Sequence, residues 1–337
     1  MSHVYQFVDV DGIPTQVLRF GKLAQRPQDL NNGEHAKIRS LSDDDDVLVL
    51  VIPGNPGIIG YYEPFMDTLF KSLKEKVSVV GISHAGHVTP PKGCVNNASN
   101  NFKSGGTTIN DVYSLEGQIK HKVLYIRRYV PQHVKLILVG HSIGAYILLK
   151  LLEQLSDLNV VKGVSLFPTI ERMALSPQGS IVTPILRYLR WLAVPPLFAL
   201  SYVPQNIREQ AIRWYFRGRN VHISAVRATE QLLDKSAAQN SLYMANDEMQ
   251  QVAAADIETI QRHLPSLIFY YGIDDHWCPV SYYQDMRELF PHGDIILCED
   301  GIAHAFVLEN GPQMALKLAQ WLEPHVAIME EVDSTSQ

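Results

Sequence analysis

A single serine stands between two glycines at residues 140–144, which read Gly-His-Ser-Ile-Gly. A continuous apolar run precedes the motif and a helical pattern follows it, so the serine is expected on a sharp turn from strand to helix. Side chains at the two glycine positions would collide where strand and helix pass each other closely. The turn places the Ser142 hydroxyl at a helix N-terminus, whose partial positive charge favours a developing oxyanion. Ser142 is therefore predicted to be a nucleophile.

A serine nucleophile needs a base to take its proton and a carboxylate to orient that base. On this kind of turn the order along the chain is serine, acid, histidine. Two acids, Asp274 and Asp275, follow the apolar run at 266–272. The spacing from Gly272 and the presence of Pro279 four residues further on favour Asp275 as the acid, and Asp274 is the alternative.

The base is predicted to be His304, which follows the apolar run at 294–300. Two other histidines are less suitable. His276 adjoins the acid in sequence and would have difficulty presenting its ring to Ser142. His292 precedes its strand and should lie at the opposite edge of the sheet. The serine, the acid and His304 all lie on loops that follow strands, so they should meet at the carboxyl edge of one sheet.

The tetrahedral intermediate of such a reaction also needs hydrogen-bond donors for its oxyanion. The backbone N–H of Ile143, directly after the nucleophile, is one expected donor. The second should come from the loop that closes the run at 47–54. This loop reads Pro53-Gly54-Asn55-Pro56-Gly57. Because Pro56 has no N–H, Asn55 is the predicted donor.

The elements that must position these groups alternate along the chain. Buried strands are expected at 47–54, 77–83, 134–140, 161–167, 266–272 and 294–300, most of them followed by a helical pattern. Two short strands should flank Asp11-Gly12, and a last helix at 311–323 should end near Pro324. Fully apolar strands that alternate with helices indicate the α/β class, with a mostly parallel central sheet covered by helices on both faces.

The alternation pauses between residues 168 and 265, which have a mainly helical pattern. We therefore expect 1–167 and 266–325 to form the core, 168–265 to be a helical cap inserted into it, and 326–337 to be a polar C-terminal tail.

A net charge of −6 argues against nucleic acid as a partner. The three cysteines make no disulfide framework, no metal or organic cofactor is needed, and the N-terminus has no secretory signal.

The most apolar part of the insertion is residues 181–203. It is long enough to span a bilayer, but two arginines and three prolines lie inside it, and both speak against a span. The prediction is a hairpin that turns at Val194-Pro195-Pro196 and enters a lipid monolayer. The predicted contact residues are Trp191, Pro195, Pro196, Leu197 and Phe198. The alternative is a cap that packs its apolar face over the active site of a soluble enzyme.

Four segments together resemble a known family. They are VIPGNPGIIGYYEPF, GHSIGAY, YGIDDHWCP and GIAHAFVLE. They are similar to the α/β-hydrolase superfamily and closely resemble the lipid droplet-associated serine hydrolases. The resemblance implies Ser142 as nucleophile, Asp275 as acid and His304 as base. It further implies attachment to lipid droplets and the cytosolic face of the endoplasmic reticulum membrane, and ester hydrolysis on neutral lipids such as sterol esters.

Two classes of function are consistent with the sequence. The first is a serine esterase or lipase-type hydrolase, and a thioesterase or acyltransferase would use the same residues. The second is a droplet-coating or scaffold protein that has a hydrolase fold and little turnover, because fold and motif do not by themselves prove activity.

Overall fold

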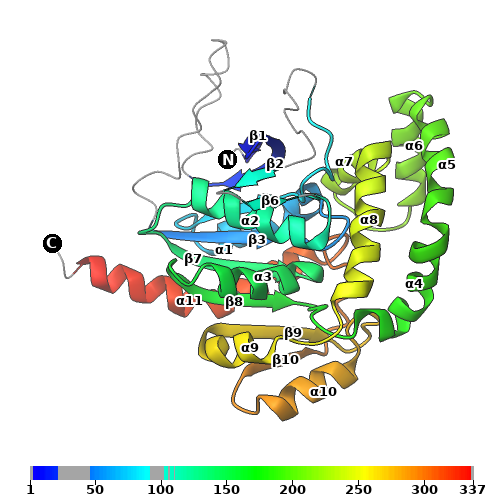
Figure 1. Ribbon diagram of the computed structural model, residues 1–337. Coiled ribbons are helices and arrows are strands. Elements are labelled where there is room, and N and C mark those ends of the chain that lie inside the picture. Colours follow the sequence, from blue (N-terminus) through cyan, green and yellow to red (C-terminus); the bar gives the residue numbers. More distant parts are fainter. Residues whose placement is uncertain (1–2, 22–45, 92–101, 105–106, 110, 335–337) are drawn as a thin grey trace, which may run out of the picture.

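The computed structural model describes residues 3–21, 46–91, 102–104, 107–109 and 111–334. Its centre is a sheet of eight strands in the order β1-β2-β4-β3-β7-β8-β9-β10 (Figure 1). Strands β1 and β2 pair antiparallel, as do β2 and β4, and all other pairs are parallel. The strands are β1 (Val4–Val10), β2 (Ile13–Phe20), β3 (Val47–Ile52), β4 (Ser78–Ile82), β7 (Lys135–His141), β8 (Val160–Leu166), β9 (Leu267–Gly272) and β10 (Asp294–Cys298). A separate pair, β5 (Phe102–Ser104) and β6 (Thr107–Ile109), lies outside this sheet.

The central strands are buried on both faces, as their apolar sequences predict. Every residue of β3 is buried, and so is every residue of β9. The antiparallel edge follows from a tight hairpin: Asp11 and Gly12 have φ values of 52° and 85°, which a two-residue turn between twisted strands requires. The predicted mostly parallel sheet is confirmed.

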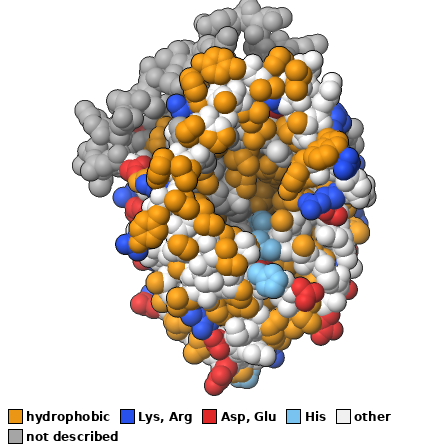
Figure 2. Space-filling model, turned by 90° about the vertical axis from the view of Figure 1, so that its right-hand side faces the viewer, with side chains coloured by type: hydrophobic (Ala, Val, Ile, Leu, Met, Phe, Trp, Pro, Cys, Tyr) orange, Lys and Arg blue, Asp and Glu red, His pale blue; other side chains and the backbone are white. Residues whose placement is uncertain are grey.

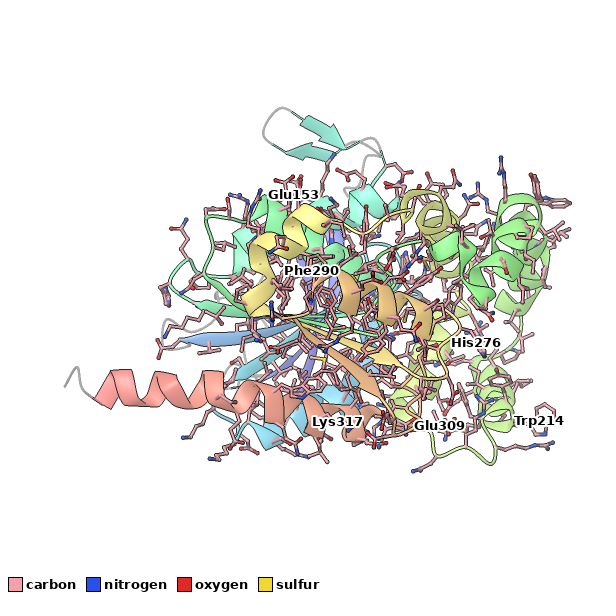
Figure 3. The ribbon with its side chains drawn as sticks, turned by 90° about the horizontal axis from the view of Figure 1, so that it is seen from below. Glu153, Trp214, His276, Phe290, Glu309 and Lys317 are labelled. Carbon is pink, nitrogen blue, oxygen red and sulfur yellow. The ribbon has the colours of Figure 1, made fainter. Side chains whose placement is uncertain are left out.

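Helices cover both faces of this sheet. On one face, α1 (Glu63–Ser72), which follows the short 3-10 helix η3 (Ile59–Tyr62), packs against α11 (Gly311–Ser334). The other face is covered by α2 (Leu115–Tyr129), α3 (Ile143–Gln154) and α9 (Ile257–His263), and α10 (Val280–Leu289) lies beside β9 and β10 (Figures 1 and 3). Hydrophobic side chains of the strands and of both helical layers form one core cluster.

The last helix differs from the sequence prediction. Helix α11 continues through Pro324 to Ser334, so the helix end near Pro324 was wrong, and the segment predicted as a polar tail is helical as far as residue 334. A proline removes one backbone donor and bends a helix, but it does not stop one when the residues on both sides continue the helical conformation.

The segment between β8 and β9 is helical, as its pattern predicts. It contains η4 (Met173–Leu175), α4 (Pro177–Leu189), η5 (Arg190–Ala193), α5 (Val194–Ser201), α6 (Gln205–Tyr215), α7 (Ile223–Leu232), α8 (Lys235–Gln251), α9 and η6 (Leu264–Ser266). Helices α4 to α8 stand together at one end of the sheet, on the right in Figure 1.

The predicted hairpin within 181–203 is not present. Helices α4 and α5 follow one another along α8, and both pack against α8 rather than against each other as two arms (Figure 1). Pro195 and Pro196 lie in the first turn of α5. The first N–H groups of a helix have no partner inside the helix, so prolines there begin a helix without loss of a hydrogen bond. The two prolines therefore start α5 and do not form the tip of a loop.

Candidate active site

The Gly-His-Ser-Ile-Gly motif forms a sharp turn between β7 and α3. Ser142 has φ 54° and ψ −123°, a strained backbone conformation at the junction. A Cβ atom on Gly140 would lie 2.4 Å from the carbonyl oxygen of Gly144. A Cβ atom on Gly144 would lie 2.3 Å from the carbonyl oxygen of Ile52 on the neighbouring strand. Both glycines are thus required by close backbone approach, which holds the serine above the sheet.

Three of the predicted site residues are joined by hydrogen bonds. The Nε2 atom of His304 lies 2.9 Å from Oγ of Ser142, and its Nδ1 atom lies 2.6 Å from Oδ2 of Asp275. The Asp275 side chain is 1% exposed and the His304 side chain 17% exposed. Because a neutral imidazole has one N–H, donation from Nδ1 to the carboxylate leaves Nε2 free to accept a proton from the serine. This arrangement can perform nucleophilic catalysis.

The alternative acid and bases lie elsewhere. Asp274, His276 and His292 are exposed. The residue types at 274–276 alone did not settle which acid turns inward. The backbone after β9 does so, because it buries Asp275 and leaves both neighbours in solvent.

The Asp275 carboxylate receives donors from its own loop. Oδ1 accepts the N–H of Trp277 at 2.7 Å and the N–H of Cys278 at 3.1 Å, and Oδ2 accepts the Cys278 thiol at 3.0 Å. Burial would raise the pKa of Asp275, but the hydrogen bond and charge of His304 and the donors of Cys278 outweigh it and lower the pKa. The carboxylate is therefore charged at neutral pH. Cys278 was not singled out from the sequence as a partner of the acid.

The same three side chains form a group of potential metal ligands within the described part of the chain. The ligand atoms of Asp275, Cys278 and His304 lie within 4.8 Å of one another. Burial, and next the charge of Asp275, raise the pKa of Cys278 well above its usual value, and its thiol donates to Oδ2 of Asp275. The hydrogen bonds among these groups and Ser142 account for their proximity.

The loop after β3 reaches the nucleophile through strand register. Ile52 pairs with Gly140, so Pro53–Gly57 emerges beside the serine turn. A Cβ atom on Gly54 would lie 2.8 Å from Cβ of Ser142. Ile143 is the first residue of α3, where a backbone N–H has no partner within the helix. Ile143 directly follows Ser142, and Asn55 directly follows Gly54, the residue that approaches the serine.

The side chain of Asn55 is held by helix α8. Its Nδ2 group donates to the carbonyl oxygen of Ser241 at 3.0 Å and to Oε1 of Glu248 at 2.9 Å. Burial raises the pKa of Glu248 to about 8, although the hydrogen bond from Asn55 opposes this, so its carboxyl is mainly protonated at neutral pH. Sequence reasoning missed Ser241 and Glu248, because nothing in their local pattern shows that α8 faces a loop nearly two hundred residues earlier.

A second chain of hydrogen bonds connects this loop to His304. The N–H of Gly54 donates to Tyr62 Oη at 2.8 Å, and Tyr62 Oη lies 2.6 Å from Nδ1 of His141. Nε2 of His141 lies 2.8 Å from the carbonyl oxygen of His304. Burial and the neighbouring His304 lower the pKa of His141 to about 3, so its ring is neutral. A carbonyl only accepts, so Nε2 carries the proton and Nδ1 accepts from Tyr62.

Tyr62→Phe is expected to lower kcat about tenfold, which corresponds to about 1.4 kcal/mol of transition-state stabilisation. The change leaves the Gly54 N–H and His141 Nδ1 buried without this partner, so both the loop and the backbone of His304 lose a fixed position. Tyr61→Phe is the matched control, because the Tyr61 hydroxyl contacts Thr229 on α7 instead. Steady-state kinetics should show the loss in kcat for Tyr62→Phe alone. Equal losses in both variants would contradict this role.

The surface around the site is apolar. Figure 2 shows a hollow with mainly hydrophobic walls and histidine side chains at its edge, on the face formed by the helices between β8 and β9. Trp191 is 63% exposed and Phe198 49% exposed, and Pro195 and Pro196 are exposed as well. The side chain of Leu197 lies outside the described residues. Within the described part of the chain, none of the helices is both long and apolar enough to cross a membrane.

A mostly parallel sheet with helices on both faces, and a serine turn at the carboxyl end of a central strand, define the α/β-hydrolase fold. The haloalkane dehalogenase variant DbeA-M1 from Bradyrhizobium elkanii has the same fold, with a TM-score of 0.59, 10% identity and full coverage of both chains.

Residues 45–307 match the family model for lipid-droplet associated hydrolase. The chain is 39% identical over 318 residues to the lipid droplet-associated hydrolase of Gallus gallus, covering 94% of each protein. It is 38% identical over 326 residues to that of Homo sapiens, covering 96% of each. The chain belongs to the lipid-droplet associated hydrolase family.

Proposed function

We propose that this hydrolase is a serine esterase that cleaves carboxylic esters of neutral lipids, such as sterol esters, through an acyl-enzyme. The observation that supports this most strongly is the continuous hydrogen-bond chain from Ser142 through His304 to the buried Asp275. The serine at the start of this chain is held in a strained turn, as a projecting nucleophile requires.

In the proposed mechanism, Oγ of Ser142 attacks the ester carbonyl carbon while Nε2 of His304 takes the hydroxyl proton. The negative carbonyl oxygen accepts hydrogen bonds from the N–H groups of Asn55 and Ile143. His304 then gives its proton to the leaving alcohol as the C–O bond breaks. A water molecule, deprotonated by His304, attacks the acyl carbon, and His304 then returns that proton to Oγ of Ser142 as the acyl–oxygen bond breaks and the acid leaves. Asp275 keeps the imidazole in the required tautomer and stabilises its charged form.

The site of action in this proposal is the surface of a lipid droplet and the cytosolic face of the endoplasmic reticulum membrane. The names of the relatives support the droplet. The exposed large side chains on α4 and η5 support contact with lipid, because tyrosine and tryptophan suit the boundary between acyl chains and water. An apolar hollow that opens on the same face would receive an insoluble ester directly from the surface (Figure 2).

The proposal is tested by labelling the purified protein with a fluorophosphonate probe and mapping the modified peptide. The expected result is a single adduct on Ser142 in folded protein and none after denaturation. A panel of sterol, glyceryl and thiol esters then identifies the substrate. If the folded protein binds droplets but is not labelled and hydrolyses no ester, the enzyme proposal fails and a droplet-coating role replaces it.

A further inference from the structure

The helices that follow β8 have a charge opposite to that of the whole protein. The chain has a net charge of −6, but residues 181–219 contain six arginines, one glutamate and no lysine or aspartate. This segment extends from within α4 to just beyond α6, so that Arg217 and Arg219 follow the last residue of α6. A cationic surface on an anionic protein indicates a specific partner and not a general property of the composition.

Half of these arginines are already paired with carboxylates. Arg208 contacts Glu230 at 3.3 Å, Arg213 contacts Glu209 at 2.7 Å, and Arg219 lies 3.9 Å from Glu309. The other three form no ion pair with any described residue. They are Arg187, Arg190 and Arg217, which we call the unpaired arginines.

The unpaired arginines lie over aromatic rings instead. The guanidinium of Arg217 is 4.2 Å from the ring centroid of Trp214. Arg187 is 5.5 Å from the ring of Tyr188, and Arg190 is 5.5 Å from the ring of Tyr243 on α8. Stacking of this kind orients the planar fork of an arginine. Arg187 and Arg217 are exposed, so their N–H groups are available to a phosphate or carboxylate, whereas Arg190 is half-buried and its Nη1 atom is buried without a partner.

The same helices expose large apolar side chains. Tyr188 is 62% exposed and Trp214 63% exposed, and Ile181, Ile185 and Tyr215 are exposed as well. Trp214 points away from the body of the protein in Figure 3. Figure 2 shows that hydrophobic side chains dominate this face, with basic side chains at several points on it. The surface thus combines groups that enter an acyl layer with cations at headgroup height.

We propose that the surface formed by α4, η5, α5 and α6 binds a phospholipid layer that contains anionic lipids, with the unpaired arginines contacting headgroup phosphates and carboxylates. The inference rests on the proposed lipid contact of this protein. It adds that the surface binds headgroups with a net negative charge more strongly than neutral ones. A zwitterionic layer presents phosphates that its own ammonium groups already balance, so it would supply these three cations with no net counter-charge. A layer that contains anionic lipid supplies one, and the flanking aromatic side chains favour lipid over an acidic protein as its source.

The test measures binding to triolein droplets coated with phosphatidylcholine alone or with added phosphatidylserine, by flotation at low salt. Wild type should bind the anionic droplets at least tenfold more strongly, because each surface arginine contributes about fivefold, and added salt should reduce the difference. The variant Arg187→Gln/Arg190→Gln/Arg217→Gln should lose this preference. The variant with lysine at all three positions should keep most of it.

The control removes the same number of charges elsewhere, from arginines that are paired with carboxylates. Arg127, Arg128 and Arg262 are exposed arginines on α2 and α9, outside the proposed surface. Their triple glutamine variant should retain the anionic preference. Equal binding of wild type to both droplets, or an unchanged preference in the first glutamine variant, would overturn the proposal. Binding of wild type to phosphatidylcholine droplets tests the proposed lipid contact by itself. Fluorophosphonate labelling of wild type tests the proposed enzyme function by itself.

Discussion

Ser142→Ala is expected to lower kcat for ester hydrolysis by roughly four to six orders of magnitude, to the level that binding alone sustains. The substitution removes the one oxygen that the His304 imidazole approaches at 2.9 Å. The Thr169 hydroxyl lies 3.5 Å from Ser142 Oγ, but no hydrogen bond joins Thr169 to His304 in the structure, so it has no base. Single-turnover and steady-state assays should therefore show neither an acyl-enzyme burst nor measurable turnover.

Ser165→Ala is the matched control for this prediction. Ser165 lies on β8, where it pairs with Gly140 of β7, and its buried hydroxyl has no partner among the described residues. The change removes the same atoms one strand away from the site, and kcat should stay within about twofold of wild type. A Ser142→Ala variant that keeps a few per cent of wild-type activity would show that another group is the nucleophile.

The three distant groups of the site were predictable because each obeys a local rule. Ser142 lies in a motif whose glycines are required sterically, and Asp275 and His304 each follow an apolar strand. Parallel strands bring their carboxyl ends to one edge, so sequence order and strand identity together predicted that the three would meet. No tertiary contact had to be known beforehand.

The supporting contacts could not be predicted in the same way. Asn55 is held by Glu248 of α8, and His141 connects Tyr62 to the backbone of His304. Each of these contacts depends on how a helix is oriented over the sheet, and a single sequence does not specify that orientation.

The two incorrect details have a common cause. Pro195 was taken as part of a hairpin turn, and Pro324 was taken as the end of a helix. A proline in the first turn begins a helix, and one in the interior bends it, so the residue type alone does not distinguish these outcomes from a break. The outcome depends on packing. Helix α8 supports both α4 and α5, and α1 packs against α11.

The structure also relates lipid contact to the proposed oxyanion loop. Helix α8 packs against α4 and α5, which expose apolar side chains, and it holds the side chain of Asn55 through Ser241 and Glu248. The same helix therefore borders the proposed lipid-binding surface on one side and the loop beside Ser142 on the other.

Asp275→Asn is expected to lower kcat by about four orders of magnitude. An asparagine would present its amide N–H group to Nδ1 of His304, which would then accept and place the ring proton on Nε2. Nε2 could no longer take the proton of Ser142, although the geometry would be almost unchanged. Asp274→Asn is the matched control, because it makes the same chemical change one residue earlier on an exposed side chain. Its kcat should remain within about twofold of wild type.

Stability measurements separate this catalytic effect from loss of the fold. The pKa of Asp275 is lower in the folded protein than its ordinary value. The charged carboxylate therefore stabilises the fold fully at pH values above the ordinary pKa, and this contribution is lost as the pH falls through the lowered pKa. Asp275→Asn should therefore melt at a lower temperature than wild type at neutral pH, with a smaller difference in acid. The variant should still be folded at the assay temperature, and its kcat should stay low there. A larger loss of kcat in Asp274→Asn would reassign the acid, and equal small losses in both variants would mean that the histidine is oriented by its backbone contacts alone.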